Sequence, residues 1–432
     1  MTTTVPASLA ERIVRPGDPE YRLLRSTYVR VHSPAQVIRP RTAAEVATAL
    51  AYARETGLPL AVRSGGHSLA GLSSNDGGVV LDLSSMNGVR VIDRARRLVR
   101  IQPGARWSRV ASALARHGLA LSSGDHGNVG VGGLATAGGI GWLVRRFGLT
   151  IDRMRSAEIV LADGTRNEID PRHDPELFWG VRGAGWALGV VTAFTFEAVE
   201  ISDVAVAQLE LELDPGRHPL AAWDEYMRGA PRELTTVMML FGGHGGATIG
   251  SLTAVYAGDD PAAAEKAFRP LTGIGVVRRA DARLVPYRAL VPTAHEHPNV
   301  GQMHSFVRNG YVDTLDDGID TLVHELVAGS GALLQLRSLG GAVSDVDPDA
   351  TAYAGRHQSA MVIGTVWSEP ALARLDRDLA PLHRRMTGAY VNFDATRGRE
   401  VLDLAYPPRT RARLRALKTR VDPDGVFAGL DG

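Results

Sequence analysis

The sequence contains no cysteine among its 432 residues. A disulfide, a thiolate metal site and a cysteine nucleophile are therefore excluded. The sequence also lacks any run of about 20 apolar residues, and residues 1–30 lack a basic segment followed by an apolar stretch. These absences predict a cytoplasmic protein with neither a membrane span nor a secretory signal.

Neither sign of charge is in excess. The chain has 48 Lys and Arg residues against 47 Asp and Glu residues, a net charge of +1. No global field therefore favours nucleic acid or an anionic membrane. The densest basic run, residues 409–420, also carries Leu414 and Leu417 at helical spacing, which is typical of an amphipathic surface helix. We expect a small-molecule substrate, with no nucleic acid and no membrane as partner.

The first quarter of the chain predicts a β-α-β unit. Residues 36–39 and 60–63 have the composition of short strands. Between them, Thr42-Ala-Ala-Glu45 is a capping box that begins a helix, and Gly57 ends it. Such a unit places the loop after its second strand at one edge of a sheet.

The rest of the chain predicts more than one domain, because 432 residues are too many for one compact core. Between about residues 204 and 388, stretches of alternating polarity are interspersed with helical ones, which indicates an antiparallel sheet with helices on one face. We therefore predict an α+β fold: a discontinuous first domain, residues 1–197 and 389–432, and an inserted, helix-flanked antiparallel-sheet domain, residues 198–388.

Three glycine clusters fall in the first domain, at residues 63–68, 129–133 and 182–189. Glycine-rich loops after strands leave backbone N–H groups open to phosphate, so they indicate a nucleotide site. Residues 130–135 formally fit the Rossmann G-x-G-x-x-A pattern, but no convincing strand precedes them, and no Walker loop is present. His67 stands beside two glycines after a strand, where it could simply hold the turn.

The order of seven motifs makes the sequence resemble the flavoproteins of the vanillyl-alcohol-oxidase/PCMH fold, in particular the berberine bridge enzyme and hydroxynicotine oxidase group. The motifs are Pro34-Ala-Gln-Val-Ile-Arg-Pro40, Arg63-Ser-Gly-Gly-His-Ser68, Gly77-Gly-Val-Val-Leu-Asp-Leu83, Gln102-Pro-Gly-Ala105, Gly130-Val-Gly-Gly133, Arg146-Phe-Gly-Leu149 and Tyr390-Val-Asn-Phe393. The resemblance implies a PCMH-type FAD-binding domain that carries an inserted substrate domain.

The resemblance also implies FAD attached by one covalent bond, from His67 to the methyl group at the flavin 8 position. A cysteine that forms a second bond in many relatives is replaced here by His126. In the family, the loop of residues 64–68 holds the pyrophosphate and the second glycine cluster lies along the flavin. The cofactor-binding residues implied are Arg63, Ser64, Gly65, Gly66, His67, Ser68, Gly124, Val129, Gly130, Gly132, Gly133 and Asn392.

The same resemblance assigns the catalytic base to Tyr390. A phenol has an ordinary pKa of about 10 and needs a neighbouring cation or the flavin to act as a base at neutral pH. Arg337 and His126 are the candidate helpers, with His126 the next candidate for the base itself. Asn392 would orient the flavin or the tyrosine. A core aromatic residue in a strand is the alternative for Tyr390.

The substrate is expected to lie between the flavin and the second domain, on a floor formed by residues 333–339 and 361–367. Four residues are pocket candidates, each of which also fits ordinary packing: Tyr287, Gln335, Arg337 and Trp367. His295, His297 and His304 invite a zinc site, but they lack the carboxylate and the helical spacing of catalytic zinc sites, so we expect no metal.

The expected activity is that of an oxidase that passes electrons from an alcohol, amine or secondary metabolite to dioxygen. In the resembling plant enzymes, a valine at the position of Val129 leaves room for dioxygen and a leucine blocks it. Two alternatives stay open: a flavin enzyme that forms or rearranges bonds, and a protein that binds a metabolite on its flavin without turnover. The sequence also leaves open whether the protein forms a homodimer.

Overall fold

The computed structural model describes residues 4–243, 247–293, 304–396 and 398–430. Three sheets and a short two-stranded ladder make up the β structure of this part of the chain. The strands are β1 (Ile13–Val14), β2 (Gln36–Ile38), β3 (Leu60–Arg63), β4 (Val79–Asp82), β5 (Val89–Asp93), β6 (Leu98–Ile101), β7 (Leu119–Ala120), β8 (Met154–Val160), β9 (Arg166–Ile169), β10 (Val190–Glu197), β11 (Val199–Glu200), β12 (Asp203–Leu213), β13 (Leu234–Gly242), β14 (Thr248–Tyr256), β15 (Val276–Pro286), β16 (Phe306–Val312), β17 (Leu333–Ser338) and β18 (Ala360–Val366).

The helices pack on the faces of these sheets. They are α1 (Tyr21–Leu24), α2 (Ala43–Thr56), α3 (Trp107–Ala115), α4 (Val131–Ala135), α5 (Val144–Phe147), α6 (Pro175–Ala184), α7 (Pro219–Gly229), α8 (Pro261–Phe268), α9 (Asp317–Ser330), α10 (Glu369–His383), α11 (Arg399–Ala405) and α12 (Pro408–Val421). Among the described residues, no helix has both the length and the apolar character that crossing a bilayer requires.

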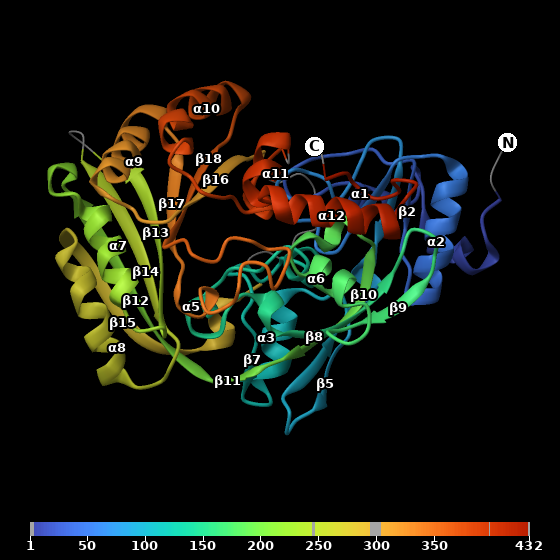
Figure 1. Ribbon diagram of the computed structural model, residues 1–432, viewed down its shortest axis with the longest axis horizontal. Coiled ribbons are helices and arrows are strands. Elements are labelled where there is room, and N and C mark those ends of the chain that lie inside the picture. The colour runs from blue at the N-terminus through green and yellow to red at the C-terminus, as the bar shows by residue number, and fades with distance from the viewer. Residues whose placement is uncertain (1–3, 244–246, 294–303, 397, 431–432) are drawn as a thin grey trace.

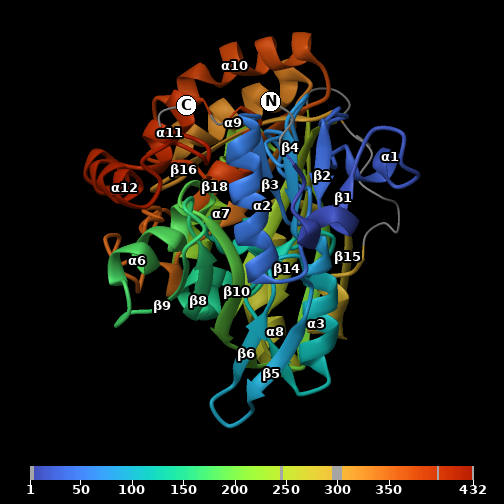
Figure 2. The ribbon, with the colours of Figure 1, turned by 90° about the vertical axis from the view of Figure 1, so that its right-hand side faces the viewer.

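The four-stranded sheet has the order β1-β2-β4-β3, with β2, β4 and β3 parallel. The predicted β-α-β unit is confirmed as β2, α2 and β3, and β4 lies between its two strands. Thr42 caps α2 by accepting a hydrogen bond from the Glu45 N–H at 3.1 Å, whereas the Glu45 carboxylate accepts from the Arg41 N–H at 2.7 Å. Figure 2 shows α2 in front of this sheet.

The second sheet is antiparallel and has the order β5-β6-β10-β8-β9. The segment between β7 and β8 contains the second glycine cluster and folds as loops with the short helices α4 and α5. Helix α3 ends at Ala115. Its last turn tightens there, since the Arg116 N–H bonds to the Leu114 carbonyl.

The third sheet has seven antiparallel strands in the order β15-β12-β14-β13-β17-β18-β16. In the second half of β12, Leu209 and Leu211 are buried under the helices, while Gln208 and Glu210 on the opposite face are exposed. Residues 204–207 of the same strand are all buried, because both faces of the sheet are covered there. Helices α7 to α10 cover one face (Figure 1). The other face packs toward the first two sheets, so the antiparallel sheet with helices on one face is confirmed.

The chain returns to its first part at the end. In Figure 1, α12 lies beside α6, and α11 lies between α12 and the seven-stranded sheet. Leu414 and Leu417 of α12 are buried, so the predicted amphipathic surface helix is confirmed. The division into residues 1–197, 198–388 and 389–432 stays a prediction, because one large hydrophobic cluster joins residues of all three segments.

Candidate active site

The first glycine-rich loop follows β3, and a buried ion pair fixes its start. Arg63 ends β3, and its Nη2 lies 2.6 Å from Asp82 Oδ2 at the end of β4. Burial alone would raise the pKa of Asp82, but the Arg63 charge and hydrogen bonds from Ser84 outweigh it, so the pKa is lowered. Arg63 Nη1 also donates to the Ser26 carbonyl at 3.1 Å. The residue that precedes the loop is therefore held by two other segments of the chain.

The two glycine clusters pack backbone against backbone. A Cβ on Gly65 would lie 2.2 Å from the Gly130 nitrogen, and a Cβ on Gly130 would lie 2.2 Å from Ser64 Oγ. Ser64 Oγ donates to the Pro103 carbonyl at 2.6 Å and accepts from the Gly132 N–H at 3.2 Å. We expected the cofactor to require glycine in both clusters. At Gly65 and Gly130 the contact between the two loops already requires it.

Other groups of the same loops are open to a ligand. A Cβ on Gly133 would meet nothing within 4 Å. In the described part of the chain, the N–H groups of Gly66 and Ser68 donate no hydrogen bond, and the buried Ser68 hydroxyl has no partner. Grouped N–H donors in a glycine-rich turn suit an anion. On these observations the loops fit the pyrophosphate and the flavin of FAD.

A buried arginine that the sequence analysis did not single out joins these loops. Arg106 Nη1 donates to the Gly65 carbonyl at 2.5 Å and to the Asn128 carbonyl. Burial lowers the pKa of Arg106. Its position just after the Gln102-Pro-Gly-Ala105 motif was the available signal, but nothing in the sequence showed which carbonyls it would reach.

Three aromatic rings gather above the loops. The His67 and His126 ring centroids lie 5.1 Å apart, so the structure brings together the expected attachment residue and the residue at the family's second attachment position. Tyr28 stacks on His67 with centroids 4.5 Å apart, and its N–H donates to the Gly66 carbonyl at 2.8 Å. Val129 is half-buried, and its N–H donates to the His126 carbonyl at 3.2 Å. Tyr28 was missed, because no motif marks it.

Tyr390 approaches the same region from the C-terminal segment. Its phenolic oxygen accepts hydrogen bonds from the Gly139 N–H at 3.0 Å and from the Asn392 amide at 3.3 Å. The Asn392 amide also donates to the Gly133 carbonyl at 3.2 Å. Two N–H donors stabilise negative charge on a phenol oxygen. Asn392 therefore holds the tyrosine against the second glycine cluster.

The backbone of Tyr390 is fixed by a buried asparagine. Asn309 Oδ1 accepts from the Tyr390 N–H at 2.8 Å, and its amide donates to the Tyr390 carbonyl at 3.1 Å. The ring packs edge-on against Tyr353 and Phe393. Tyr390 is only 3% exposed, so it is a core aromatic residue, but it lies in a loop and not in the strand that the alternative expected.

Of the four substrate-pocket candidates, Gln335 and Arg337 lie together on β17. Arg337 Nε donates to Gln335 Oε1 at 2.7 Å, and its Nη2 lies 2.6 Å from Asp125 Oδ2. The guanidinium carbon lies 5.0 Å from the centroid of the Phe393 ring, which itself packs on Tyr390. Asp125 was missed, although it adjoins His126 in the sequence.

The other two candidates lie elsewhere. Tyr287 is buried behind the segment that leads to Asp125. Its hydroxyl lies 3.2 Å from Ser123 Oγ and donates to the Leu121 carbonyl, and burial raises its pKa to about 12. Trp367 is 47% exposed beyond the end of β18, whose opposite end pairs with Arg337.

The metal alternative involves three histidines, of which His295 and His297 lie outside the described residues. His304 is exposed. The described residues contain no group of three His, Asp or Glu side chains that could hold a metal ion.

Comparisons with known proteins also point to FAD. Residues 34–170 match the FAD binding domain family. (R)-6-hydroxynicotine oxidase of Paenarthrobacter nicotinovorans is 28% identical over 98% of this chain and 96% of its own. The solved structure of a chitooligosaccharide oxidase has a TM-score of 0.86 at 25% identity, over 97% and 96% of the two chains.

A third likeness concerns the fold alone. The BBE-like 1 protein of Physcomitrella patens superposes with a TM-score of 0.87 at 22% identity, over 99% of this chain and 98% of that one. With the glycine-rich loops and the expected attachment histidine in place, the chain contains an FAD binding domain, has the PCMH-type fold and is similar along almost its whole length to the FAD-linked oxidoreductases of the berberine-bridge-like and 6-hydroxynicotine-oxidase-like group.

Proposed function

We propose that this protein is an oxidase in which FAD is bonded to His67 alone, Tyr390 accepts a proton from the substrate and dioxygen accepts the electrons. The observation that carries the proposal is a set of hydrogen bonds between Tyr390 and the region of the second glycine cluster. The Gly139 N–H and the Asn392 amide donate to the Tyr390 hydroxyl, and the Asn392 amide also donates to the Gly133 carbonyl. These hydrogen bonds support the proposal, because they connect the Tyr390 hydroxyl to loops that fit the cofactor. Neither a bond-rearranging enzyme nor a metabolite-binding protein is favoured by a separate observation.

Different residues would hold the pyrophosphate, the flavin ring and the covalent bond of FAD. The free N–H groups of Gly66 and Ser68 suit the pyrophosphate, and the open side of Gly133 leaves room for a flat ring. Because the chain has no cysteine, His67 is the family attachment residue that remains, with His126 at the second position. When bound, the flavin supplies the acceptor for a hydride from a C–H bond next to oxygen or nitrogen.

Tyr390 would take the proton from the O–H or N–H group of the substrate. Its oxygen already accepts two N–H hydrogen bonds, so the charge left after it loses its own proton is stabilised before the substrate arrives. Arg337 lies beyond the Phe393 ring and is neutralised by Asp125. We therefore assign the stabilisation of Tyr390 to Gly139 and Asn392 before Arg337.

The substrate would be a small molecule rich in hydroxyl or amine groups. The floor offers the Arg337–Asp125 ion pair and the Gln335 amide, which favour hydrogen-bonding ligands over apolar ones. The names of two relatives point to such substrates, a hydroxynicotine and a chitooligosaccharide. Amino sugars, sugars and hydroxylated heterocyclic amines are the classes to test first.

The covalent attachment has a direct test. After acid precipitation and washing, the yellow colour should stay with the protein, and digestion followed by mass spectrometry should find flavin on the peptide that carries His67. His67→Ala should release the colour, whereas the matched variant His126→Ala should keep it. Colour in the wash of the unmodified protein, or flavin on another peptide, would show the attachment to be wrong.

The activity is tested by turnover. The purified protein should bleach when mixed without air with a substrate from these classes, and it should produce hydrogen peroxide steadily once air is admitted. Bleaching without peroxide would exclude dioxygen as the acceptor. Binding without bleaching across all classes would instead support a metabolite-binding protein.

A further inference from the structure

The strand β15 (Val276–Pro286) forms an open edge of the seven-stranded sheet. Among the described residues it pairs only with β12, so one side of the strand has no ladder partner. Ten of its 11 residues are exposed, including Val276 at 57% and Leu284 at 47%. Natural proteins usually keep edge strands short or covered, because free N–H and C=O groups invite another strand.

An apolar groove runs beside this edge. It has a volume of about 530 Å³ and lies between α8 and the strands β12 and β15. Helix α8 contacts β12 and β14, and Ala280, Ala282 and Leu284 of β15 stay exposed along the groove. Exposed Leu284 and the groove together provide an apolar surface next to unpaired backbone.

The charges on one face of β15 alternate in sign, while Arg278 on the opposite face pairs with Glu212. Asp281 lies between Arg279 and Arg283, and Arg283 Nη1 is 2.7 Å from Asp281 Oδ2 within the strand. Charges on an edge strand usually prevent pairing. Here an antiparallel second copy in one register would match them, because opposite charges directly across a ladder stabilise it and like charges destabilise it.

That register places Ala282 opposite Ala282 of the second copy. Asp281 then faces Arg283 of the second copy, and the twofold symmetry repeats this pair. On the other face of the sheet, Ala280 faces Leu284 of the second copy, next to the apolar groove. A shift that centres the ladder on Asp281 would instead set Arg279 against Arg283 and Asp281 against itself.

We propose that two copies of this chain form a homodimer by antiparallel pairing of β15 with β15, with Ala282 on the twofold axis. Main-chain hydrogen bonds then close the open edge, two reciprocal Asp281–Arg283 pairs fix the register, and the two seven-stranded sheets become continuous. The interface lies on the edge of the sheet away from the candidate active site, so it does not depend on the proposed function.

The absence of cysteine makes a cross-linking test specific. Residues opposite each other in an antiparallel ladder have Cα atoms about 4.5–5.5 Å apart, within the range that a disulfide spans. Ala282→Cys should therefore form a covalent dimer under mild oxidation. Ala280→Cys is the matched control, because its two copies would be separated by four positions of the ladder, about 13 Å, and should stay monomeric on a denaturing gel.

The oligomeric state and its charge dependence complete the test. Sedimentation equilibrium of the flavin-loaded protein should show a dimer. Arg283→Asp, which sets Asp against Asp281, should shift it to monomer with unchanged flavin content. The double change Asp281→Arg with Arg283→Asp should restore the dimer.

Three results would overturn the proposal. They are a monomer at all concentrations up to about 100 μM, a dimer that Arg283→Asp leaves intact, and cross-linking through position 280 in place of 282. The first excludes the dimer, the second moves it to another surface, and the third excludes the register.

Discussion

At the scale of single residues, the candidate site depends on two hydrogen bonds to the hydroxyl of Tyr390. Its two N–H donors come from Gly139, which lies 251 positions earlier in the chain, and from Asn392, two positions later. The motif Tyr390-Val-Asn-Phe393 predicted the second donor. It did not predict Gly139 or the clamp from Asn309, because neither residue belongs to a recognisable pattern.

We predict that Tyr390→Phe slows anaerobic flavin reduction by roughly 100-fold or more, the usual scale for losing a general base. Flavin content should not change, since the ring still packs against Tyr353 and Phe393. Tyr311→Phe is the matched control: it also removes a buried hydroxyl, one that lies 2.6 Å from the Tyr353 hydroxyl. Stopped-flow reduction should separate the two, and equal rates would move the base to another group, with His126 next.

Val129 carries a prediction about dioxygen. It is half-buried, and its backbone is held by the His126 carbonyl and by the Trp107 N–H, so an added methylene cannot easily be accommodated by movement of the loop. Val129→Leu should slow the reoxidation of photoreduced protein in air while substrate-driven reduction stays within a few-fold. A leucine variant that reoxidises as fast as the unmodified protein would contradict this role.

At the scale of elements, the site depends on loops held between regular structures. The Ser64–Ser68 loop is fixed below by the Arg63–Asp82 pair and beside by Gly130 and Arg106. The strand and the glycines were predicted from the sequence. The contact between the two glycine clusters was not, because the clusters are about 60 residues apart and no local pattern encodes their distance.

Substitutions at two glycines distinguish the effect of loop packing on stability from the effect of the loops on cofactor binding. Gly65→Ala should lower the free energy of unfolding by about 1–3 kcal/mol, because its Cβ would collide with the Gly130 backbone. Gly133→Ala meets open space within α4 and should leave the stability of the flavin-free protein equal or up to about 1 kcal/mol higher. It should nevertheless reduce flavin incorporation. Urea titration and flavin absorbance measure the two effects, and unchanged flavin content in Gly133→Ala would mean that this side of the loop does not face the cofactor.

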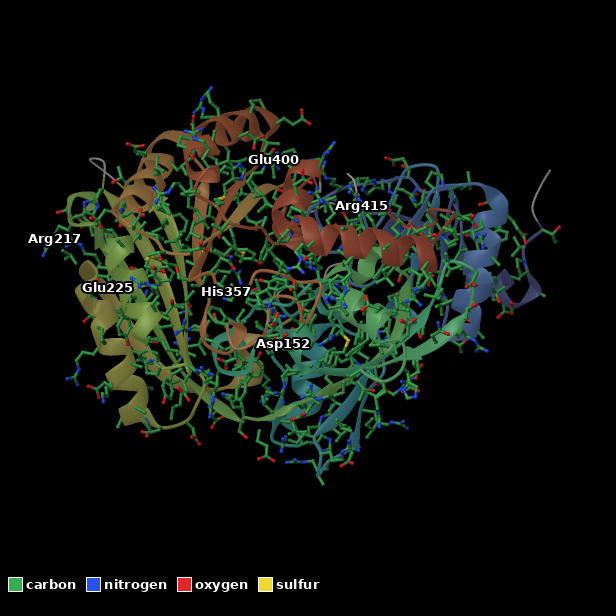
Figure 3. All side chains as sticks on the ribbon, in the orientation of Figure 1. Asp152, Arg217, Glu225, His357, Glu400 and Arg415 are labelled. Carbon is green, nitrogen blue, oxygen red and sulfur yellow. The ribbon has the colours of Figure 1, made fainter. Side chains whose placement is uncertain are left out.

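At the scale of the whole molecule, buried arginines join the flavin-binding part to the seven-stranded sheet. Arg145 of α5 donates to the carbonyls of Leu234, Met227 and Leu339, and burial, with the nearby Arg232 charge, lowers its pKa to about 10. Figure 3 shows Asp152 in the middle of the molecule, where its carboxylate accepts two hydrogen bonds from Arg356, both at 2.9 Å.

The Asp152–Arg356 pair predicts a large effect on stability. Arg356 is fully buried, so Arg356→Met should leave the Asp152 carboxylate without its cation and lower the free energy of unfolding by about 3–5 kcal/mol. The exposed bidentate pair between Arg232 and Asp345 is the control, and Arg232→Met should leave the unfolding transition almost unchanged, because solvent screens an exposed ion pair. Similar urea midpoints for the two variants would show that the buried pair does not hold the two parts together.

The sequence by itself determined the local structure and the chemistry of the cofactor loops. The capping residue Thr42, the strand before Ser64 and the amphipathic α12 follow from patterns within a few residues, because hydrogen-bond geometry and side-chain periodicity act over that range. The motif around His67 indicated FAD, and the lack of cysteine excluded any thiol linkage to it.

Only the tertiary structure decided which distant residues meet. The stacking of Tyr28 on His67, the pairing of Arg337 with Asp125 and the exposed edge of β15 depend on sheet order and on the docking of one sheet against another. Those arrangements arise from burial summed over many residues, which no short motif records. For the same reason Trp367, chosen from residue type, lies beyond the end of β18 that is opposite to the end paired with Arg337.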